Sequence, residues 1–215
     1  MATRDLKFKS LSKWAVLGSM TVVMFASLAW MGEAPAQSKT VMNLQAAYTA
    51  EANAYVRYLA FAERAQENEF GEAASLFRAA GCAEHIHLKN LAALMRKLGY
   101  EPVIRVDTPV VKTTKENLRS SAEVGEAYER DTLYPEFVKE ARTEGNDEAV
   151  RVFQHMVRAE AQHATLFKAA LGNLQKMDAT NRVYYVCSMC GYTSERAVKP
   201  CPGCGHPEPT YEEMF

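Results

Sequence analysis

The chain has almost no excess of charge of either sign. Its 215 residues include 25 Lys and Arg against 26 Asp and Glu, which gives a formal net charge of −1. Proteins that bind nucleic acid or an acidic membrane surface usually carry a basic excess, so the sequence indicates neither partner. With 48% hydrophobic and 24% charged residues, it has the composition of a globular protein of one or two domains.

Cysteine is scarce over most of the chain. There are five cysteines, of which Cys82 stands alone in a helical pattern and the other four follow residue 186. Chemistry that needs several cysteines is therefore confined to the C-terminal tail.

The N-terminus lacks an Arg-Arg pair, which favours general secretion over the twin-arginine route. Basic residues there precede an uncharged run over residues 14–31, and Ala34 and Ala36 form an A-x-A cleavage signal. The run is also just long enough to span a membrane. We therefore predict that residues 1–36 are a signal peptide or an N-terminal membrane anchor, and that the protein is exported, either periplasmic or anchored facing the periplasm.

Four long stretches with few glycines or prolines have apolar residues at helical spacing, at about residues 41–68, 72–98, 115–143 and 147–176. Gly71 and Gly145 separate the members of each pair, so each pair should be an antiparallel hairpin. The connection GYEPVIRVDTPVVKTT is too long for a tight turn and suits the crossover of a ferritin-like bundle. We predict an all-α ferritin-like four-helix bundle over residues 40–178.

The two helix pairs repeat each other. TVMNL opens the first helix and TKENL the third, each with its threonine (Thr40 and Thr114) as the predicted N-cap. AEHIH of the second helix likewise matches AEAQH of the fourth. The copies are offset by one residue, because the third helix has one residue more than the first before its inward-facing glutamate.

Each helix has polar residues in the middle of its apolar stripe. They are Glu51 in the first helix, Glu84 and His87 in the second, Glu126 and Glu129 in the third, and Glu160 and His163 in the fourth. A single residue of this kind is usually a boundary residue or a satisfied core histidine. Several carboxylates buried together would be strongly unfavourable without cations, and two divalent cations would supply four positive charges.

The spacing of these residues predicts a dinuclear metal site. Glu and His three residues apart lie on one helix face and can reach the same metal. Di-iron carboxylate bundles use one Glu from each of two helices and a Glu-x-x-His motif from each of the other two. Oxygen and imidazole ligands suit iron or manganese. We predict a dinuclear site, for iron or manganese, held by Glu51, Glu84, His87, Glu126, Glu160 and His163.

Glu129 is an additional carboxylate. It lies three residues after Glu126 and so faces the same cavity, whereas the corresponding position of the first helix is Ala54. Oxidation of two ferrous ions adds two positive charges, which a further carboxylate would stabilise. We predict that Glu129 and neutral His87 compete for one iron, His87 in the reduced state and Glu129 in the oxidised state. The alternative is a solvated surface glutamate beside Arg130.

Two tyrosines lie about two helical turns after inward-facing glutamates. Tyr58 follows Glu51 by seven residues and Tyr134 follows Glu126 by eight. Their hydroxyls should reach back toward the carboxylates, and we predict that they donate hydrogen bonds that orient the ligands. Aromatic packing in the core is the alternative.

The tail, residues 182–215, lacks a helical stripe and contains two CxxC pairs. The cysteines are Cys187, Cys190, Cys201 and Cys204. Each pair is followed by glycine, which allows a tight turn whose N–H groups point at the sulfurs. A segment this short needs a metal to fold, and four thiolates suit one iron. Structural zinc and disulfides are the alternatives.

Together these residues resemble the rubrerythrin family, a ferritin-like di-iron domain followed by a rubredoxin-like FeS4 domain. The resemblance rests on AEHIH, GEAYERDTLYPEF, AEAQH and the two CxxCG segments, and it extends over residues 40–215. It implies a non-haem peroxidase for oxidative-stress defence, which reduces hydrogen peroxide to water with electrons from an unidentified redox donor. It also implies that Glu84 and Glu160 bridge the irons. The family's homodimers can bring one chain's FeS4 centre close to another chain's di-iron site.

Two other functions compete with peroxide reduction. A ferroxidase or iron-handling protein would use the same bundle, but it needs no electron-accepting tail. A non-enzymatic electron carrier or zinc-stapled interaction module would need no complete di-iron ligand set. The family is mostly cytoplasmic, so the predicted export is a departure that would require a periplasmic or membrane-bound electron donor.

Overall fold

The computed structural model describes residues 38–215. The predicted signal peptide or anchor, residues 1–36 with the apolar run 14–31, lies outside the described residues. Among residues 38–215, no helix combines the length and the apolar character needed to cross a membrane.

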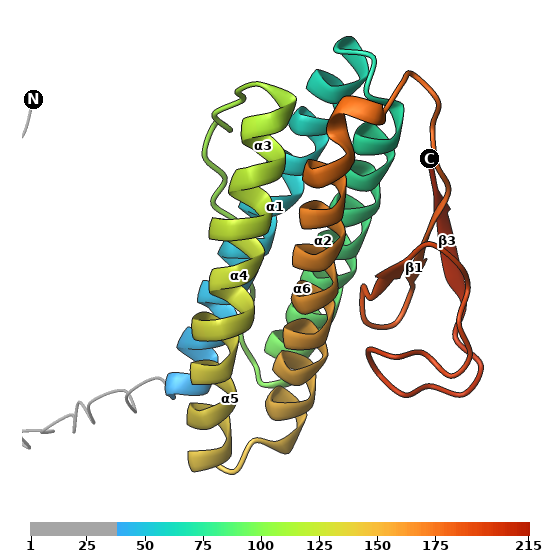
Figure 1. The fold of residues 1–215 in the computed structure, drawn as a ribbon. Coiled ribbons are helices and arrows are strands. Elements are labelled where there is room, and N and C mark those ends of the chain that lie inside the picture. The colour runs from blue at the N-terminus through green and yellow to red at the C-terminus, as the bar shows by residue number, and fades with distance from the viewer. Residues whose placement is uncertain (1–37) are drawn as a thin grey trace, which may run out of the picture. The chain divides into compact units, whose positions relative to one another are not determined.

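Four helical segments form the bundle seen in Figure 1, as two antiparallel hairpins joined by the crossover. They are α1 (Lys39–Glu67); α2 (Gly71–Lys97); a third made of α3 (Thr114–Ser120), η1 (Ser121–Gly125), α4 (Glu126–Tyr128), η2 (Glu129–Leu133) and α5 (Tyr134–Thr143); and α6 (Asp147–Asn173) with η3 (Leu174–Lys176). The crossover between α2 and α3 runs along α1, where Gln45 and Asn53 hydrogen-bond its backbone. The predicted ferritin-like bundle with a long crossover is confirmed.

The third helical segment is not the continuous α-helix predicted over residues 115–143. The stretch η1 is π-helical, and the N–H of Glu126 donates to the carbonyl of Ser121, five residues earlier. A π-helical turn holds one residue more than an α-helical turn allows. It therefore absorbs the one-residue excess between Asn117 and Glu126, so that Glu126 still faces the bundle interior.

The second π-helical stretch, η2, has the same origin. Tyr134 follows Glu126 by one residue more than Tyr58 follows Glu51. The N–H of Tyr134 donates to the carbonyl of Glu129, again five residues back. Tyr134 is consequently buried in the core at 0% exposure, as Tyr58 of α1 is at 1%.

The two predicted N-caps are displaced. Ser38 caps α1 by accepting from the N–H of Val41, and Thr113 caps α3 in a capping box with Glu116. Thr40 and Thr114 lie one or two residues further on and are buried in the first turns. In each case an equivalent hydroxyl stands earlier in the sequence, so the residue type alone could not locate the helix start.

Two apolar clusters occupy the bundle on either side of its polar middle layer. One gathers aromatic side chains that include Tyr58, Phe77 and Phe167, with ring centroids 5.2–6.0 Å apart. The other includes Tyr134 and Phe153, whose centroids are 6.2 Å apart. The polar layer between them is thereby held on rigid, well-packed helices.

The tail forms a three-stranded antiparallel sheet of order β2-β1-β3. Its strands are β1 (Tyr184–Cys187), β2 (Thr193–Ser194) and β3 (Tyr211–Met214). The sheet lies beside α2 and α6 (Figure 1), and Arg158 of α6 donates to the carbonyl of Gly203 at 3.0 Å. The tail therefore packs on the same two helices that carry the Glu-x-x-His motifs.

Candidate metal centres

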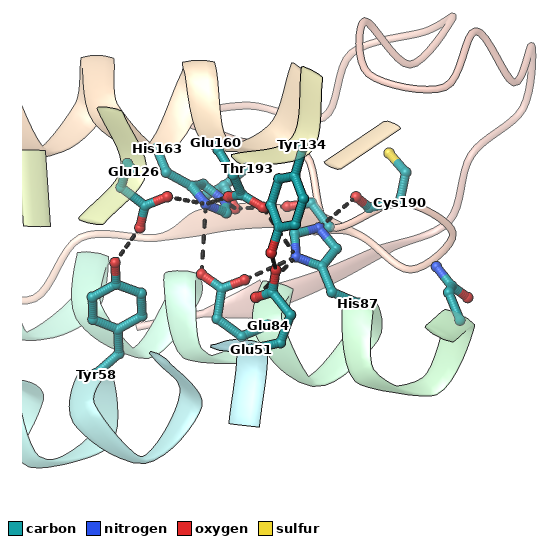
Figure 2. Close-up of polar contacts among 12 residues, drawn as sticks. Glu51, Tyr58, Glu84, His87, Glu126, Tyr134, Glu160, His163, Cys190 and Thr193 are labelled. Carbon is teal, nitrogen blue, oxygen red and sulfur yellow. Dashed lines mark hydrogen bonds and ion pairs between the residues drawn. The ribbon is translucent and has the colours of Figure 1, made fainter. Parts of the chain in front are cut away.

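Six side chains from all four helical segments converge in the polar layer (Figure 2). Their potential ligand atoms form two overlapping groups, Glu51, Glu84, His87 and Glu160, and Glu84, Glu126, Glu160 and His163. Within each group the atoms lie within 4.8 Å of one another, and Glu84 and Glu160 belong to both. We call these six residues the carboxylate–histidine cluster. Two neighbouring cations that share two carboxylates would fit this arrangement.

The cluster is buried, and its polar atoms lack enough protein partners. Its six residues are 0–1% exposed. The atoms without a hydrogen-bond partner include Glu51 Oε2, Glu84 Oε1, Glu126 Oε2, both carboxylate oxygens of Glu160, and His163 Nδ1. Buried charges are strongly unfavourable unless they are paired or bind metal. The donor set thus fits two divalent cations, which would coordinate these atoms.

Proton affinities in the metal-free cluster point the same way. Burial and the neighbouring charge of Glu160 raise the pKa of Glu84 well above its ordinary value, and burial likewise raises the pKa of Glu160. Burial by itself would lower the pKa of His87. The charge of Glu160 and the hydrogen bond with Glu51 outweigh burial and raise that pKa to about 9. Without metal, the site therefore holds protons to offset its negative charge.

The two tyrosines hydrogen-bond across the bundle. Tyr58 of α1 donates to Oε1 of Glu126, and Tyr134 donates to Oε1 of Glu51 (Figure 2). Burial raises the pKa of both phenols well above the ordinary value, which keeps them protonated as donors. Each tyrosine thus orients a glutamate on the other helical segment. The two hydrogen bonds occupy equivalent positions in the internal repeat.

Glu129 lies beside the cluster but belongs to neither group of four. It is 8% exposed, more than the other inward-facing carboxylates. Burial, and then the charges of Glu51 and Glu126, raise the pKa of Glu129 well above its ordinary value. It is therefore a buried side chain and not a solvated surface glutamate.

Sequence reasoning missed Arg57. Its half-buried guanidinium lies 5.4 Å from the centroid of the Tyr58 ring. Burial lowers the pKa of Arg57, but Tyr58 and Glu129 raise it on balance. Arg57 therefore places a positive charge on the Glu129 side of the cluster. The available signal was a long cationic side chain immediately before a predicted core tyrosine.

The four cysteines of the tail form a second candidate centre, which we call the four-cysteine site. Sγ atoms of Cys187, Cys190, Cys201 and Cys204 lie within 4.8 Å of one another. Sγ of Cys190 and Sγ of Cys201 are 3.7 Å apart, whereas a disulfide needs about 2.05 Å. A hydrogen bond from Cys190, opposed by burial, lowers the pKa of Cys187 to about 5. Over residues 38–215 all the cysteines are free thiols, so metal binding and not disulfide formation fits the tail.

The four-cysteine site contacts the carboxylate–histidine cluster within the same chain. Nε2 of His87 lies 3.1 Å from the carbonyl oxygen of Cys190, which Figure 2 marks with a dashed line. Asn90, one turn further along α2, donates to the carbonyl of Met189 at 2.8 Å. The family resemblance implied that the FeS4 centre of a partner chain could lie close to the di-iron site. In this structure, residues of the same chain bring the two sites together. The homodimer itself stays a prediction.

Gly191 allows this close approach, and its replacement provides a test. Its φ is +75°, and a Cβ would lie 2.6 Å from Nε2 of His87. Gly205 is the matched control, because its φ is +74° but no atom lies within 4 Å of its Cβ position. We expect Gly205→Ala to cost only the backbone strain of about 1–2 kcal/mol.

Gly191→Ala should add a clash with His87 to that strain and move the loop away from α2. If electrons pass from a metal at the four-cysteine site to metals in the carboxylate–histidine cluster, their transfer should slow markedly in Gly191→Ala and little in Gly205→Ala. Stopped-flow spectroscopy of both variants measures this difference. Equal rates would show that the contact has no part in electron delivery.

Comparison with known proteins gives consistent matches. The family model described as Rubrerythrin matches residues 42–171. Nigerythrin from Nitratidesulfovibrio vulgaris is 36% identical over 179 residues, which cover 82% of this chain and 87% of nigerythrin. Rubrerythrin from Porphyromonas gingivalis is 32% identical over 182 residues, which cover 82% of this chain and 90% of that protein. A structure of nigerythrin in a partially reduced state matches with a TM-score of 0.73 and 35% identity, covering 83% of this chain and 90% of that chain.

The predicted location is corrected by these comparisons. Homologues of this kind are cytoplasmic, so the prediction of an exported protein, periplasmic or membrane-anchored, is wrong. The inference that its electron donor is periplasmic or membrane-bound is withdrawn with it. The prediction rested on the composition of residues 1–36, where a basic start, an uncharged run and small residues are compositional signals only.

Proposed function

Because the chain belongs to the rubrerythrin family, we propose that it reduces hydrogen peroxide to water at its di-iron site, with electrons delivered through the four-cysteine site. The family consists of di-iron oxidoreductases implicated in oxidative-stress defence. The reaction H₂O₂ + 2e⁻ + 2H⁺ → 2H₂O balances with two electrons, which two ferrous ions can supply together. An external redox donor then restores the reduced state.

The contact between His87 and the carbonyl of Cys190 is the observation that carries this proposal. A peroxidase must receive electrons repeatedly, and the four-cysteine site touches a residue of the carboxylate–histidine cluster. A ferroxidase takes its electrons from the iron that it oxidises and has no use for such a contact. The structures of nigerythrin are named for partially reduced, mixed-valent and all-ferrous states, so the iron of that relative changes oxidation state.

Each residue of the cluster has a role in holding the two irons. Glu84 and Glu160, which belong to both groups of four, would contact both irons, whereas Glu51 and His87 would hold one and Glu126 and His163 the other. The membership of Glu84 and Glu160 in both groups of four supports this assignment. Tyr58 and Tyr134 keep Glu126 and Glu51 in a fixed orientation through their hydroxyl hydrogen bonds.

Glu129 and His87 exchange at one iron in this proposal. When bound, the two irons supply the two electrons that reduce the O–O bond. The site becomes more positive as these electrons leave it. Glu129 would then replace His87 as a ligand, because a carboxylate offsets the added positive charge and a neutral imidazole does not. In the structure His87 is within a group of four and Glu129 is outside both, which is one of the two arrangements that the exchange requires. Arg57 stabilises Glu129 while it is outside.

The proposal is tested by the choice of oxidant. The full-length protein, loaded with iron and fully reduced without oxygen, is mixed separately with hydrogen peroxide and with dioxygen in a stopped-flow spectrometer. We expect peroxide to oxidise both iron centres much faster than dioxygen does. If dioxygen is as fast or faster, the chain is an oxidase or a ferroxidase and the peroxidase proposal fails.

A further inference from the structure

The outer nitrogen of His163 has a partner in the tail. Nε2 of His163 lies 3.0 Å from Oγ1 of Thr193 in β2, and both side chains are 0% exposed. Figure 2 labels Thr193 next to His163. The same hydroxyl donates to the carbonyl of Gly191 at 3.1 Å. Thr193 therefore connects a cluster histidine to the loop that holds Cys190.

The protons of this small network can be assigned. A hydroxyl has one proton, and Thr193 donates it to the carbonyl of Gly191, so Thr193 accepts from the N–H at Nε2 of His163. This leaves Nδ1 of His163 facing the carboxylates, 2.7 Å from Oε2 of Glu160 and 3.5 Å from Oε2 of Glu126. Nδ1 is thus the nitrogen that can bind a metal.

His87 is held in the same way. A carbonyl oxygen can only accept, so the N–H at Nε2 of His87 donates to Cys190. Its Nδ1 then faces Oε2 of Glu84 at 2.9 Å and Oε1 of Glu160 at 3.2 Å. The two histidines come from α2 and α6, yet both outer nitrogens bond to residues only three positions apart in the tail.

We propose that Thr193 is a positioning residue for His163, through which the tail completes the di-iron site as well as delivering electrons to it. Hydrogen bonds to the outer nitrogen of a metal-bound histidine set its tautomer and ring orientation. The tail provides both of these bonds, so its folding around the metal of the four-cysteine site orders both histidines. The inference rests on the di-iron site of the proposed function but does not depend on which oxidant is reduced.

Three variants of the full-length protein separate this role from packing. Thr193→Val keeps the β-branched shape and removes the hydroxyl, whereas Thr193→Ser keeps the hydroxyl. Ser194→Ala is the matched control, because Ser194 is a buried neighbour whose hydroxyl donates instead to the carbonyl of Arg196 at 2.7 Å. Only Thr193→Val should affect His163.

The readout is ferrous iron binding, measured without oxygen against a competing chelator, together with magnetic circular dichroism of the loaded site. We expect Thr193→Val to weaken iron binding by about 10-fold and to change the ferrous spectrum, because loss of such a supporting hydrogen bond typically has this effect on metal affinity. Thr193→Ser and Ser194→Ala should match the wild type. Wild-type affinity and spectrum in Thr193→Val would overturn the proposal.

A measurement on the wild type covers the case in which Thr193→Val does not fold. The protein is loaded with Zn²⁺ as a diamagnetic substitute, and its histidine nitrogens are followed by ¹⁵N NMR. We expect His163 to carry a slowly exchanging proton on Nε2. A proton on Nδ1 would refute the assignment. Neither experiment uses peroxide. A negative result for Thr193 would therefore be distinct from failure of the peroxidase proposal.

Discussion

Replacement of Glu129 with Ala is expected to lower peroxide turnover by about 100-fold while two irons still bind. The six residues of the carboxylate–histidine cluster form both groups of four without Glu129, so the ferrous site should assemble normally. What is lost is the carboxylate that, in the proposed exchange, stabilises the more positive, oxidised site. Removal of one preorganised electrostatic stabiliser typically costs about 10²–10³ in rate.

The measurements are steady-state peroxide consumption, iron stoichiometry, and the spectra of both oxidation states. Glu129→Gln keeps the size of the side chain and removes its charge, so it should resemble Glu129→Ala. Glu123→Ala changes an exposed glutamate of the same helical segment and should behave as wild type. Unchanged turnover in both Glu129 variants would disprove the exchange between Glu129 and His87. A loss of iron in parallel with activity would instead make Glu129 an obligatory ligand.

Removal of iron from the cluster should reverse the way in which the protein's stability depends on pH. In the metal-free protein the pKa of His87 is raised from 6.5 to about 9, so the folded state holds a proton that the unfolded state releases. That contribution is complete below pH 6.5 and is lost as pH rises through about 9. It amounts to about 3 kcal/mol, from about 1.4 kcal/mol for each pKa unit.

The buried carboxylates act in the same direction. Burial raises the pKa of Glu84, Glu129 and Glu160, so these groups also keep protons in the folded state that the unfolded chain releases at lower pH. Glu51 opposes them, because hydrogen bonding and charge from His87 outweigh burial and lower its pKa. With iron bound, the ligands must be deprotonated, so metal binding strengthens as pH rises. The stability difference between loaded and metal-free protein should therefore widen with pH.

Calorimetry on protein from which a chelator has removed the di-iron metals, with the metal of the four-cysteine site retained, measures this effect. We expect the metal-free Tm to fall by roughly 10 °C between pH 6.5 and pH 9, from the usual ratio of Tm to free-energy change in chains of this size. His87→Gln should lose the part of this fall that comes from His87 and leave the part that comes from the buried carboxylates. His85→Gln should keep the whole fall, because His85 is exposed on the same helix. A metal-free Tm that rises over this interval would contradict the argument.

The sequence by itself determined which side chains meet in the bundle. A helix places residues three and four apart on one face, so Glu84, His87, Glu160 and His163 could be recognised as polar interruptions of an apolar stripe. The paired CxxC segments identified the second centre for a similar reason, because local spacing dictates which sulfurs converge. Composition was a poor guide by comparison, and the location inferred from residues 1–36 was wrong.

Other features could be seen in the sequence but not interpreted. The internal repeat showed one extra residue before Glu126 and another before Tyr134, yet it could not show how the helix absorbs them. Only the packed bundle decided that, because two π-helical turns keep Glu126 and Tyr134 facing the interior while the rest of the segment remains α-helical.

The tertiary structure alone decided how the two centres meet. Cys190 contacts His87 through its backbone carbonyl, across 103 residues of sequence. A carbonyl is common to every residue, so no residue type or spacing can indicate that contact. In the sequence, Thr193 looks like an ordinary buried strand residue. Its hydroxyl reaches His163 only because the tail packs on α2 and α6. Local periodicity thus specified the ligands, whereas long-range packing specified what surrounds and orients them.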